Sequence, residues 1–381
     1  GRRREMEVAA EREAAPGLLA KLLEQPWEKR LALVRRNERY QSLALADLLL
    51  ERCREHRGGS PPAPSTPEST ERTELAELAA AVAENLDPAA CGPAVVRGLL
   101  GRAWVETAEA RRLAGDLPGA ERAARSAAPL LAHEESEPVE RLALLRLEAA
   151  IAASHGRFEE ADRLFDRAAL ACRTAGEPHL QGSVLIERGT LHAASERYGS
   201  AIELLREGAE LLSPENPPGN PRDVDMTLLA SALHRQAALL WEVGRGGEAL
   251  AVAGRLCPLY ERLGNRAGLL RLRWLLGNIE EDETALLEAR EGLLAEGLGL
   301  AAAQISLDLA VLYARKGRAA EIHRLAAEIF PIFRNRDLRR ESMAALLVFR
   351  RAVETESASV EFLVEVARYL LGSHRTRWGS L

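Results

Sequence analysis

Aromatic side chains are scarce in this chain. Only 4% of its 381 residues are Phe, Trp or Tyr, although 47% are hydrophobic. The apolar residues are therefore mostly Ala and Leu, which have high helix propensities, whereas the β-branched and aromatic residues typical of strands are sparse. A chain of this composition is expected to build its core from closely packed helices and not from a β-sheet.

The chain also has few cysteines and no large net charge of either sign. None of the four cysteines forms a Cys-x-x-Cys pair, which argues against a zinc or thiol-exchange motif. The formal net charge of −6, from 51 basic and 57 acidic residues, provides no overall positive field for nucleic acid or for an anionic membrane. No apolar run approaches the roughly 18 residues needed to span a bilayer, and the charged N-terminus lacks the hydrophobic core of a signal peptide. We therefore expect a cytoplasmic protein that does not bind a membrane.

Motifs for catalysis and cofactor binding are missing as well. The chain contains no His-Glu-x-x-His, Gly-x-Ser-x-Gly or Gly-x-x-x-x-Gly-Lys-Ser/Thr pattern, and none of its eight histidines lies four residues from another. Residues 244–249 loosely resemble a dinucleotide fingerprint, but they follow a predicted helix, whereas the fingerprint follows a strand. The sequence predicts no catalytic residue, no metal and no cofactor, so we expect a protein that is not an enzyme.

Proline and glycine divide the chain into segments. Amphipathic helices are predicted at about 40–56 and 71–86, and the residues between them contain four prolines and many Ser and Thr, which indicates a flexible loop. The predicted organisation is an N-terminal helical segment (1–57), this loop (58–70), helical repeats (71–335), and C-terminal capping helices with a tail (336–381).

A turn pattern recurs from residue 115 onward. Turns begin at residues 115, 156, 196, 244 and 317, usually with Gly, and a small or apolar residue follows five positions later. Gly in the left-handed conformation ends a helix, and a small residue lets the next helix pack closely. The intervals are 41, 40, 48 and 73 residues, so the last one corresponds to two repeats, with a shortened turn expected around 278–283.

This pattern resembles the turn between helices A and B of a tetratricopeptide repeat. Trp104, Phe165, Gly189 and Tyr313 occupy aromatic or small positions of that motif. The resemblance covers about residues 94–335, with six units in phase. Because the intervals exceed the usual 34 residues, the chain is similar to bacterial proteins of the long-repeat kind, which include sensor and regulatory domains. The resemblance implies an all-α fold, a right-handed α-solenoid of antiparallel helix pairs.

The resemblance also implies where a ligand would bind. In such repeats the second, fifth, ninth and twelfth positions of helix A line a concave groove. The polar, charged and tryptophan residues at or beside these positions are Arg102, Glu109, Arg112, Arg146, Thr190, His234, Trp241, Arg271, Trp274, Asn278, Gln304 and Arg315.

Arginine and tryptophan dominate many binding hot spots, and the arginine fork suits carboxylates. We therefore hypothesise that the groove binds an acidic or C-terminal peptide segment, with Arg271 and Trp274 at its centre. The alternative is that Trp241 and Trp274 pack between repeats and that the arginines pair with Glu of neighbouring helices.

Asp308 is an acidic residue within an otherwise apolar stretch of a predicted helix A. It is either a buried functional acid, as perturbed carboxyl groups often are, or the partner of Arg273 or Arg315.

The expected function is protein or peptide binding, as an adaptor or regulatory subunit. An alternative is a ligand- or peptide-sensing regulatory domain of a bacterial signalling or transcription system. A basic cluster at residues 29–39 raises the further possibility of nucleic-acid binding, but no helix-turn-helix pattern accompanies it, so we expect no nucleic-acid partner.

Overall fold

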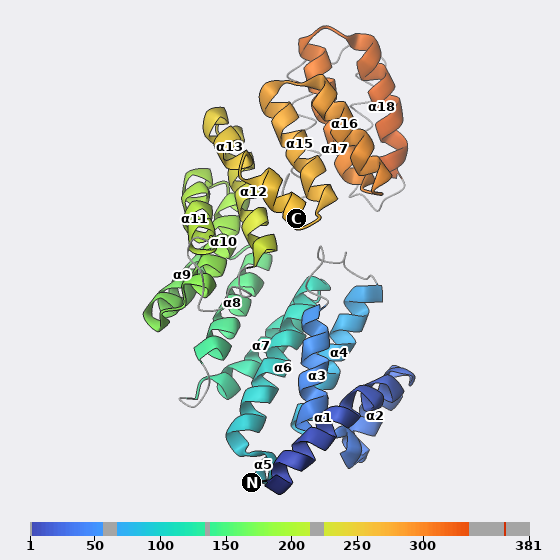
Figure 1. Ribbon diagram of the computed structural model, residues 1–381, viewed down its shortest axis with the longest axis vertical. Helices are drawn as coiled ribbons and strands as arrows, with labels where there is room; N and C mark the ends of the chain where they lie inside the picture. The colour runs from blue at the N-terminus through green and yellow to red at the C-terminus, as the bar shows by residue number, and fades with distance from the viewer. Residues whose placement is uncertain (1, 56–66, 134–137, 214–224, 335–361, 363–381) are drawn as a thin grey trace. The chain divides into compact units, whose positions relative to one another are not determined.

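The computed structural model describes residues 2–55, 67–133, 138–213, 225–334 and 362 (Figure 1). The chain forms two compact units, residues 1–191 and 192–381. All regular elements among the described residues are helices. The predicted capping helices and tail (336–381) lie outside the described residues, except for Phe362, which packs against a core of the second unit.

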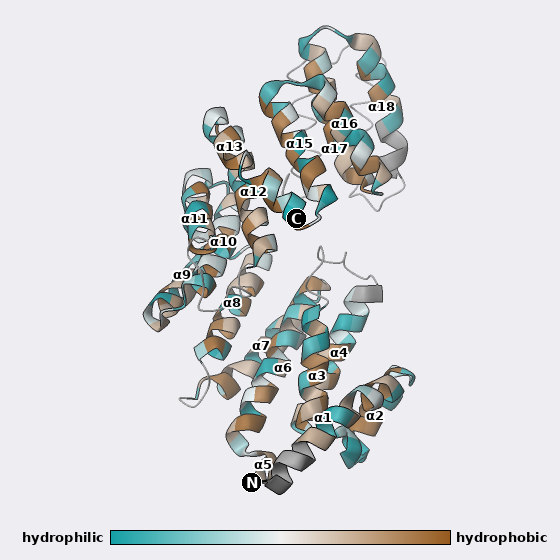
Figure 2. Cartoon of the chain, viewed as in Figure 1, coloured by the Kyte–Doolittle hydropathy of each residue, from teal (hydrophilic) through white to brown (hydrophobic). Residues whose placement is uncertain are grey.

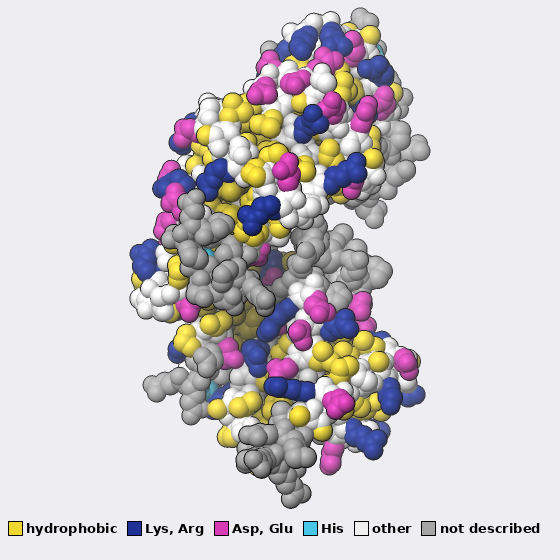
Figure 3. Space-filling model, viewed as in Figure 1, with side chains coloured by type: hydrophobic (Ala, Val, Ile, Leu, Met, Phe, Trp, Pro, Cys, Tyr) yellow, Lys and Arg dark blue, Asp and Glu magenta, His cyan; other side chains and the backbone are white. Residues whose placement is uncertain are grey.

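Six helix pairs follow one another at the predicted turns, and where both helices of a pair lie within one unit they pack against each other. The helices of the pairs are α6 (Pro93–Leu113) and α7 (Leu117–Leu131), α8 (Pro138–Ser154) and α9 (Phe158–Ala175), α10 (Pro178–Ala194) and α11 (Tyr198–Leu211), α12 (Met226–Glu242) and α13 (Gly246–Ala253), α15 (Arg266–Glu280) and α16 (Glu283–Ala295), and α17 (Gly299–Arg315) and α18 (Ala319–Arg334). Figure 2 shows hydrophobic and hydrophilic residues along the same helices, the amphipathic pattern that such packing requires. On the face seen in Figure 3, basic and acidic side chains are interspersed.

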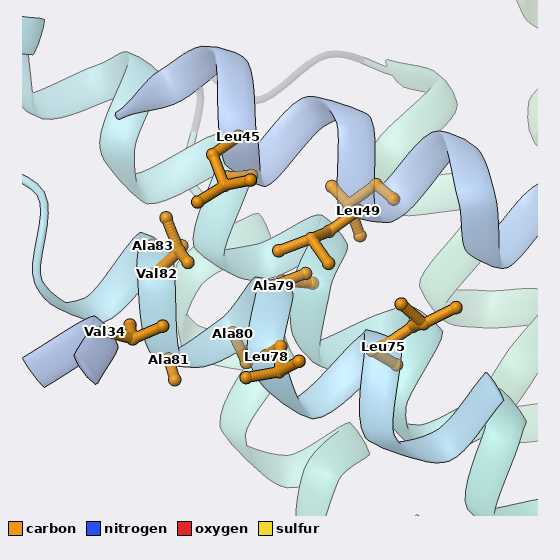
Figure 4. Close-up of a cluster of buried hydrophobic side chains, with 14 of the residues drawn as sticks. Val34, Leu45, Leu49, Leu75, Leu78, Ala79, Ala80, Ala81, Val82 and Ala83 are labelled. Carbon is orange, nitrogen blue, oxygen red and sulfur yellow. The ribbon is translucent and has the colours of Figure 1, made fainter. Parts of the chain in front are cut away.

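The N-terminal helices pack on one apolar core. They are α1 (Arg2–Leu23), α2 (Trp27–Arg36), the short 3-10 helix η1 (Glu38–Tyr40), α3 (Leu43–Glu55) and α4 (Pro67–Glu84), and the brief α5 (Pro88–Cys91) precedes α6. Leu45 and Leu49 of α3 are buried in the same cluster as Leu75 and Leu78 of α4 (Figure 4). The predicted helices at 40–56 and 71–86 are therefore present.

The described end of the predicted loop is helical. Residues 67–70 belong to α4, and the rest of the loop up to residue 66 lies outside the described residues. Pro67 suits the first helical turn because its fixed φ fits the helix and its missing N–H would have no partner there.

All six turns have the same hydrogen bond. One residue of each turn has a positive φ, and the next amide donates to a carbonyl five residues back, at 2.8–2.9 Å. Gly takes the positive φ in four turns, whereas Glu196 (φ 60°) and Glu281 (φ 53°) take it in the third and fifth. The fifth turn was expected to be shortened. It has two residues between its helices where the others have three, but it keeps the hydrogen bond.

The second helix of the fourth pair is interrupted. It ends as α13 at Ala253 and resumes as α14 (Leu256–Arg262). Pro258 explains the break because it has no N–H to donate to the carbonyl of residue 254, and its ring would clash with that carbonyl in a continuous helix. The break matters for the site described below, since α14 carries Tyr260, whose hydroxyl lies 3.0 Å from Nδ1 of His234 on α12.

Candidate functional site

The candidate site is the set of first helices of the six pairs, namely α6, α8, α10, α12, α15 and α17, here called the A helices. All twelve residues that the sequence predicts for the groove lie on these helices. The structure assigns them different surroundings in the two units.

Arginines on the A helices of the first unit are paired within the chain. Arg102 lies 3.5 Å from Asp47 of α3 and 3.4 Å from Glu140 of α8. Arg112 donates two hydrogen bonds to Glu109, at 2.8 and 2.9 Å. Both arginines are therefore neutralised by carboxylates of this chain.

Arg146 links two consecutive A helices. Its Nε donates to Oε2 of Glu187 at 3.0 Å, which joins α8 to α10. The charge of Glu187 is the largest influence on the pKa of Arg146, which is raised even though burial opposes this. In the first unit, then, Arg102 and Arg146 pair with Glu of neighbouring helices, as in the alternative stated above, whereas Arg112 pairs with Glu109 of its own helix.

Three other predicted residues lie in surroundings that differ from one another. The Thr190 hydroxyl donates to the carbonyl of Ile186 at 2.9 Å, one turn earlier in the same helix. Arg315 is exposed and donates to Glu281 at 2.8 Å. Gln304 is half-buried, and none of the described residues is hydrogen-bonded to its side chain.

His234 is fully buried in the second unit. Burial lowers its pKa to about 3, with smaller contributions from the charges of Arg271 and Arg235. Its ring is therefore neutral near pH 7. Burial also raises the pKa of its hydrogen-bond partner Tyr260, so the pair presents no charge to the arginines beside it.

Trp274 and Asn278 share one acceptor. Trp274 is 2% exposed, and its Nε1 donates to Oδ2 of Asp308 at 2.7 Å. The amide of Asn278 donates to the same oxygen at 2.9 Å. This burial favours packing between repeats over a hot-spot role for Trp274.

The expected partners of Asp308 were wrong. Arg273 pairs with Glu288 at 2.7 Å, and Arg315 pairs with Glu281. Asp308 is buried and is held by neutral donors from the preceding A helix.

Trp241 is half-buried against a cluster that contains Leu240 and Ala249.

Arg271 and Arg235 differ from every other arginine whose side chain the structure describes. Both are half-buried, and neither has a hydrogen bond or an ion pair from its side chain to any of the described residues. The remaining described arginines are either exposed or engaged by other groups. Burial without a counter-charge lowers the pKa of both. The sequence reasoning found Arg271 but missed Arg235.

A signal for Arg235 does exist in the repeats. It lies nine residues before the left-handed residue of its turn (244 − 9 = 235), and the same count gives Glu106, Glu187 and Asp308 in other repeats (115 − 9, 196 − 9, 317 − 9). A basic residue thus stands at a position that is acidic in three of the six repeats.

No model of a known protein family matches the chain, and neither does the sequence of any curated protein. Similar solved structures include aspartyl phosphate phosphatase F from Bacillus subtilis, with 14% identity over 85% of this chain and 79% of that one and a TM-score of 0.58. The apo form of RapI is 10% identical over 76% and 99%, with a TM-score of 0.53. BtubC from P. vanneervenii is 16% identical over 61% and 93%, with a TM-score of 0.51.

At these identities the likeness concerns the fold alone, and it confirms the predicted all-α helical-repeat solenoid of the tetratricopeptide type. None of the described helices is long and apolar enough to cross a membrane. Within the same described residues, no group of three or more His, Cys, Asp or Glu side chains could hold a metal ion.

Proposed function

We propose that this chain is an interaction module that binds a protein or peptide through its A helices and acts as an adaptor or regulatory subunit. One observation carries the proposal. Arg271, on an A helix, is half-buried and has no carboxylate partner among the described residues, whereas Arg146 at the equivalent position of the second repeat is paired with Glu187. A partly desolvated charge without a partner is unfavourable, so a counter-charge supplied by a binding partner would complete the site.

The buried polar groups support a role in binding over one in catalysis. His234 and Asp308 are buried titratable groups on A helices of the second unit. His234 is bonded to Tyr260, and Asp308 accepts from Trp274 and Asn278. Both are engaged by side chains of the core, which is the ordinary arrangement of structural buried groups.

We further place the chain among long-repeat tetratricopeptide proteins of bacterial regulatory systems, in a cytoplasmic setting. Successive left-handed turn residues are 41, 40, 48, 37 and 36 positions apart (115, 156, 196, 244, 281, 317), and each interval exceeds the usual 34 residues. The scarcity of cysteine fits a reducing compartment.

Site-specific photo-crosslinking in the native cells tests the binding face. A photoreactive residue replaces Gln304, which is half-buried on the A helix α17, or Leu294, which is 39% exposed on the second helix α16 of the preceding pair. We expect a discrete crosslinked product from position 304 and none from position 294. Absence of a product from position 304, or equal products from both positions, would reject the A helices as the binding face.

A further inference from the structure

Equivalent positions of different repeats can be compared by counting back from the left-handed residue of each turn. This comparison, here called repeat equivalence, shows which carboxylate Arg271 would be expected to pair with. Arg146 and Arg271 each lie ten residues before the left-handed residue of their own turn (156 − 10 and 281 − 10). Glu187, the partner of Arg146, lies nine residues before the left-handed residue of the next turn (196 − 9). The same count places Asp308 opposite Arg271 (317 − 9).

Asp308 does not take that role. Its Oδ2 accepts from Trp274 and from Asn278, which lie three and seven residues after Arg271 on the same helix. The structure gives no ion pair between Asp308 and Arg271. The carboxylate that repeat equivalence assigns to Arg271 is therefore hydrogen-bonded to Trp274 and Asn278 in the core, and the charge of the Arg271 guanidinium is not compensated by it.

Arg235 adds a second uncompensated charge on the preceding A helix. It stands at a position where three other repeats have Glu or Asp, and it is half-buried without an ion pair. Arg235 directly follows His234 on α12, and the ring of Tyr260, which bonds to His234, packs against Gly268 of α15, three residues before Arg271. The charges of both arginines also lower the pKa of His234. The groups known to face them are the neutral His234 and Tyr260, which come from α12 and α14.

Two partly desolvated guanidinium groups around a neutral pair constitute a site for an anion. A guanidinium offers parallel N–H donors that match the two oxygens of a carboxylate, and such charge-assisted pairs are stronger than neutral hydrogen bonds. Burial of part of each side chain also limits the conformations that binding would have to freeze, which favours affinity.

We propose that Arg235 and Arg271 form a carboxylate-binding site on the second unit, which takes an acidic side chain or the C-terminal carboxylate of a partner's peptide segment. This assignment rests on the proposed function and specifies the partner's chemistry. The site is built from consecutive A helices, α12 and α15, and needs no residue outside the described part of the second unit.

Calorimetric titration of the full chain with an N-acetylated hexaglutamate peptide tests the site, with hexaglutamine as the neutral probe. We expect hexaglutamate alone to bind. Arg235→Gln and Arg271→Gln should each weaken binding at least tenfold, and Arg271→Lys, which keeps the charge but loses the fork, should fall between the wild type and Arg271→Gln. The matched control is Arg262→Gln, because Arg262 is an exposed arginine of α14 without an ion pair in the described structure. Its affinity should stay within twofold of the wild type.

Three outcomes would overturn the proposal. The wild type does not bind hexaglutamate, or the Arg235→Gln and Arg271→Gln variants bind it as tightly as the wild type does. The third is that inorganic phosphate binds as tightly as hexaglutamate, which would mark an unspecific anion site. Thermal melts of each variant check that loss of binding is not loss of folding. If crosslinking from position 304 persists while hexaglutamate fails to bind, the carboxylate site is rejected and the proposed function stands. If hexaglutamate binds through the arginines while no crosslink forms, the proposed function is rejected.

Discussion

The indole Nε1 of Trp274 donates a 2.7 Å hydrogen bond to Asp308, 34 residues further along the chain. The bond joins consecutive A helices inside the core of the second unit. It holds a buried carboxylate and, by doing so, withdraws that carboxylate from Arg271.

Trp274→Phe should destabilise the chain. The substitution removes the N–H and leaves the buried Asp308 with one fewer donor, and such a loss costs about 1–3 kcal/mol of unfolding free energy. Urea unfolding measures the change. Trp241→Phe is the control, because Trp241 is only half-buried, and it should cost less. Equal effects of the two substitutions would contradict a structural role for the bond to Asp308.

The sequence could predict the turns because their chemistry is local. Gly115, Gly156, Gly244 and Gly317 supply the left-handed conformation directly, and the apolar period places each helix. Glu281 takes the same conformation without being Gly. The fifth turn therefore looked irregular in the sequence although its hydrogen bond is the same as in the others.

The site was less predictable because it depends on which of several possible partners a side chain meets. Arg146 and Arg271 occupy equivalent positions, yet one is paired and the other is not. The difference arises because Asp308 is bound by Trp274 and Asn278. Side-chain packing determines which donors bind Asp308, and the sequence pattern does not indicate them.

Arg146 and Glu187 should show a favourable coupling energy. The pair is partly exposed, with side-chain exposures of 31% and 36%, so solvent screening limits the expected value to about 0.5–1 kcal/mol. A double-mutant cycle with Arg146→Gln and Glu187→Gln, followed by urea unfolding, measures it. A coupling of zero would mean that the link between α8 and α10 does not contribute to stability.

Glu196→Gly should stabilise the chain. Glu196 has a φ of 60°, where a side chain is strained and Gly is not, and no ion pair is given for its side chain. Relief of this strain should raise the unfolding free energy by about 0.5–1 kcal/mol, offset in part by the greater backbone entropy of Gly in the unfolded chain. Gly156→Ala, at the equivalent residue of the preceding repeat, should destabilise. A loss of stability in Glu196→Gly would contradict the strain.

The buried His234 should make stability depend on pH. Its pKa is about 3 in the folded chain and about 6.5 when unfolded. Between these values the unfolded state binds the additional proton, so the stabilisation is fully present above pH 6.5 and is lost as the pH falls towards 3. The slope is at most about 1.4 kcal/mol per pH unit.

His234→Gln isolates this effect from the titration of carboxylates. Glutamine does not titrate and can still bond to Tyr260. The unfolding free energy of the wild type minus that of the variant should decrease from pH 7 to pH 4.5. A difference that stays constant over this range would show that His234 is not buried as a neutral ring.

Arg271→Met should leave the unliganded chain as stable as the wild type or make it more stable. The arginine is half-buried without a counter-charge, and replacing an uncompensated buried charge by an apolar side chain of similar length removes a desolvation penalty, for a gain of up to about 1 kcal/mol. Arg290→Met is the matched control. Arg290 lies on α16 of the same unit, but its Nε donates to Ser306 at 2.7 Å, and it pairs with Glu328. Its replacement should therefore lower the melting temperature, because it leaves a buried hydroxyl and a carboxylate without their donor.

The same Arg271→Met chain should have lost hexaglutamate binding, so that stability and affinity change in opposite directions. A lower melting temperature in both variants would mean that Arg271 already has a stabilising partner within the chain, and the site for a partner's carboxylate would then have no basis.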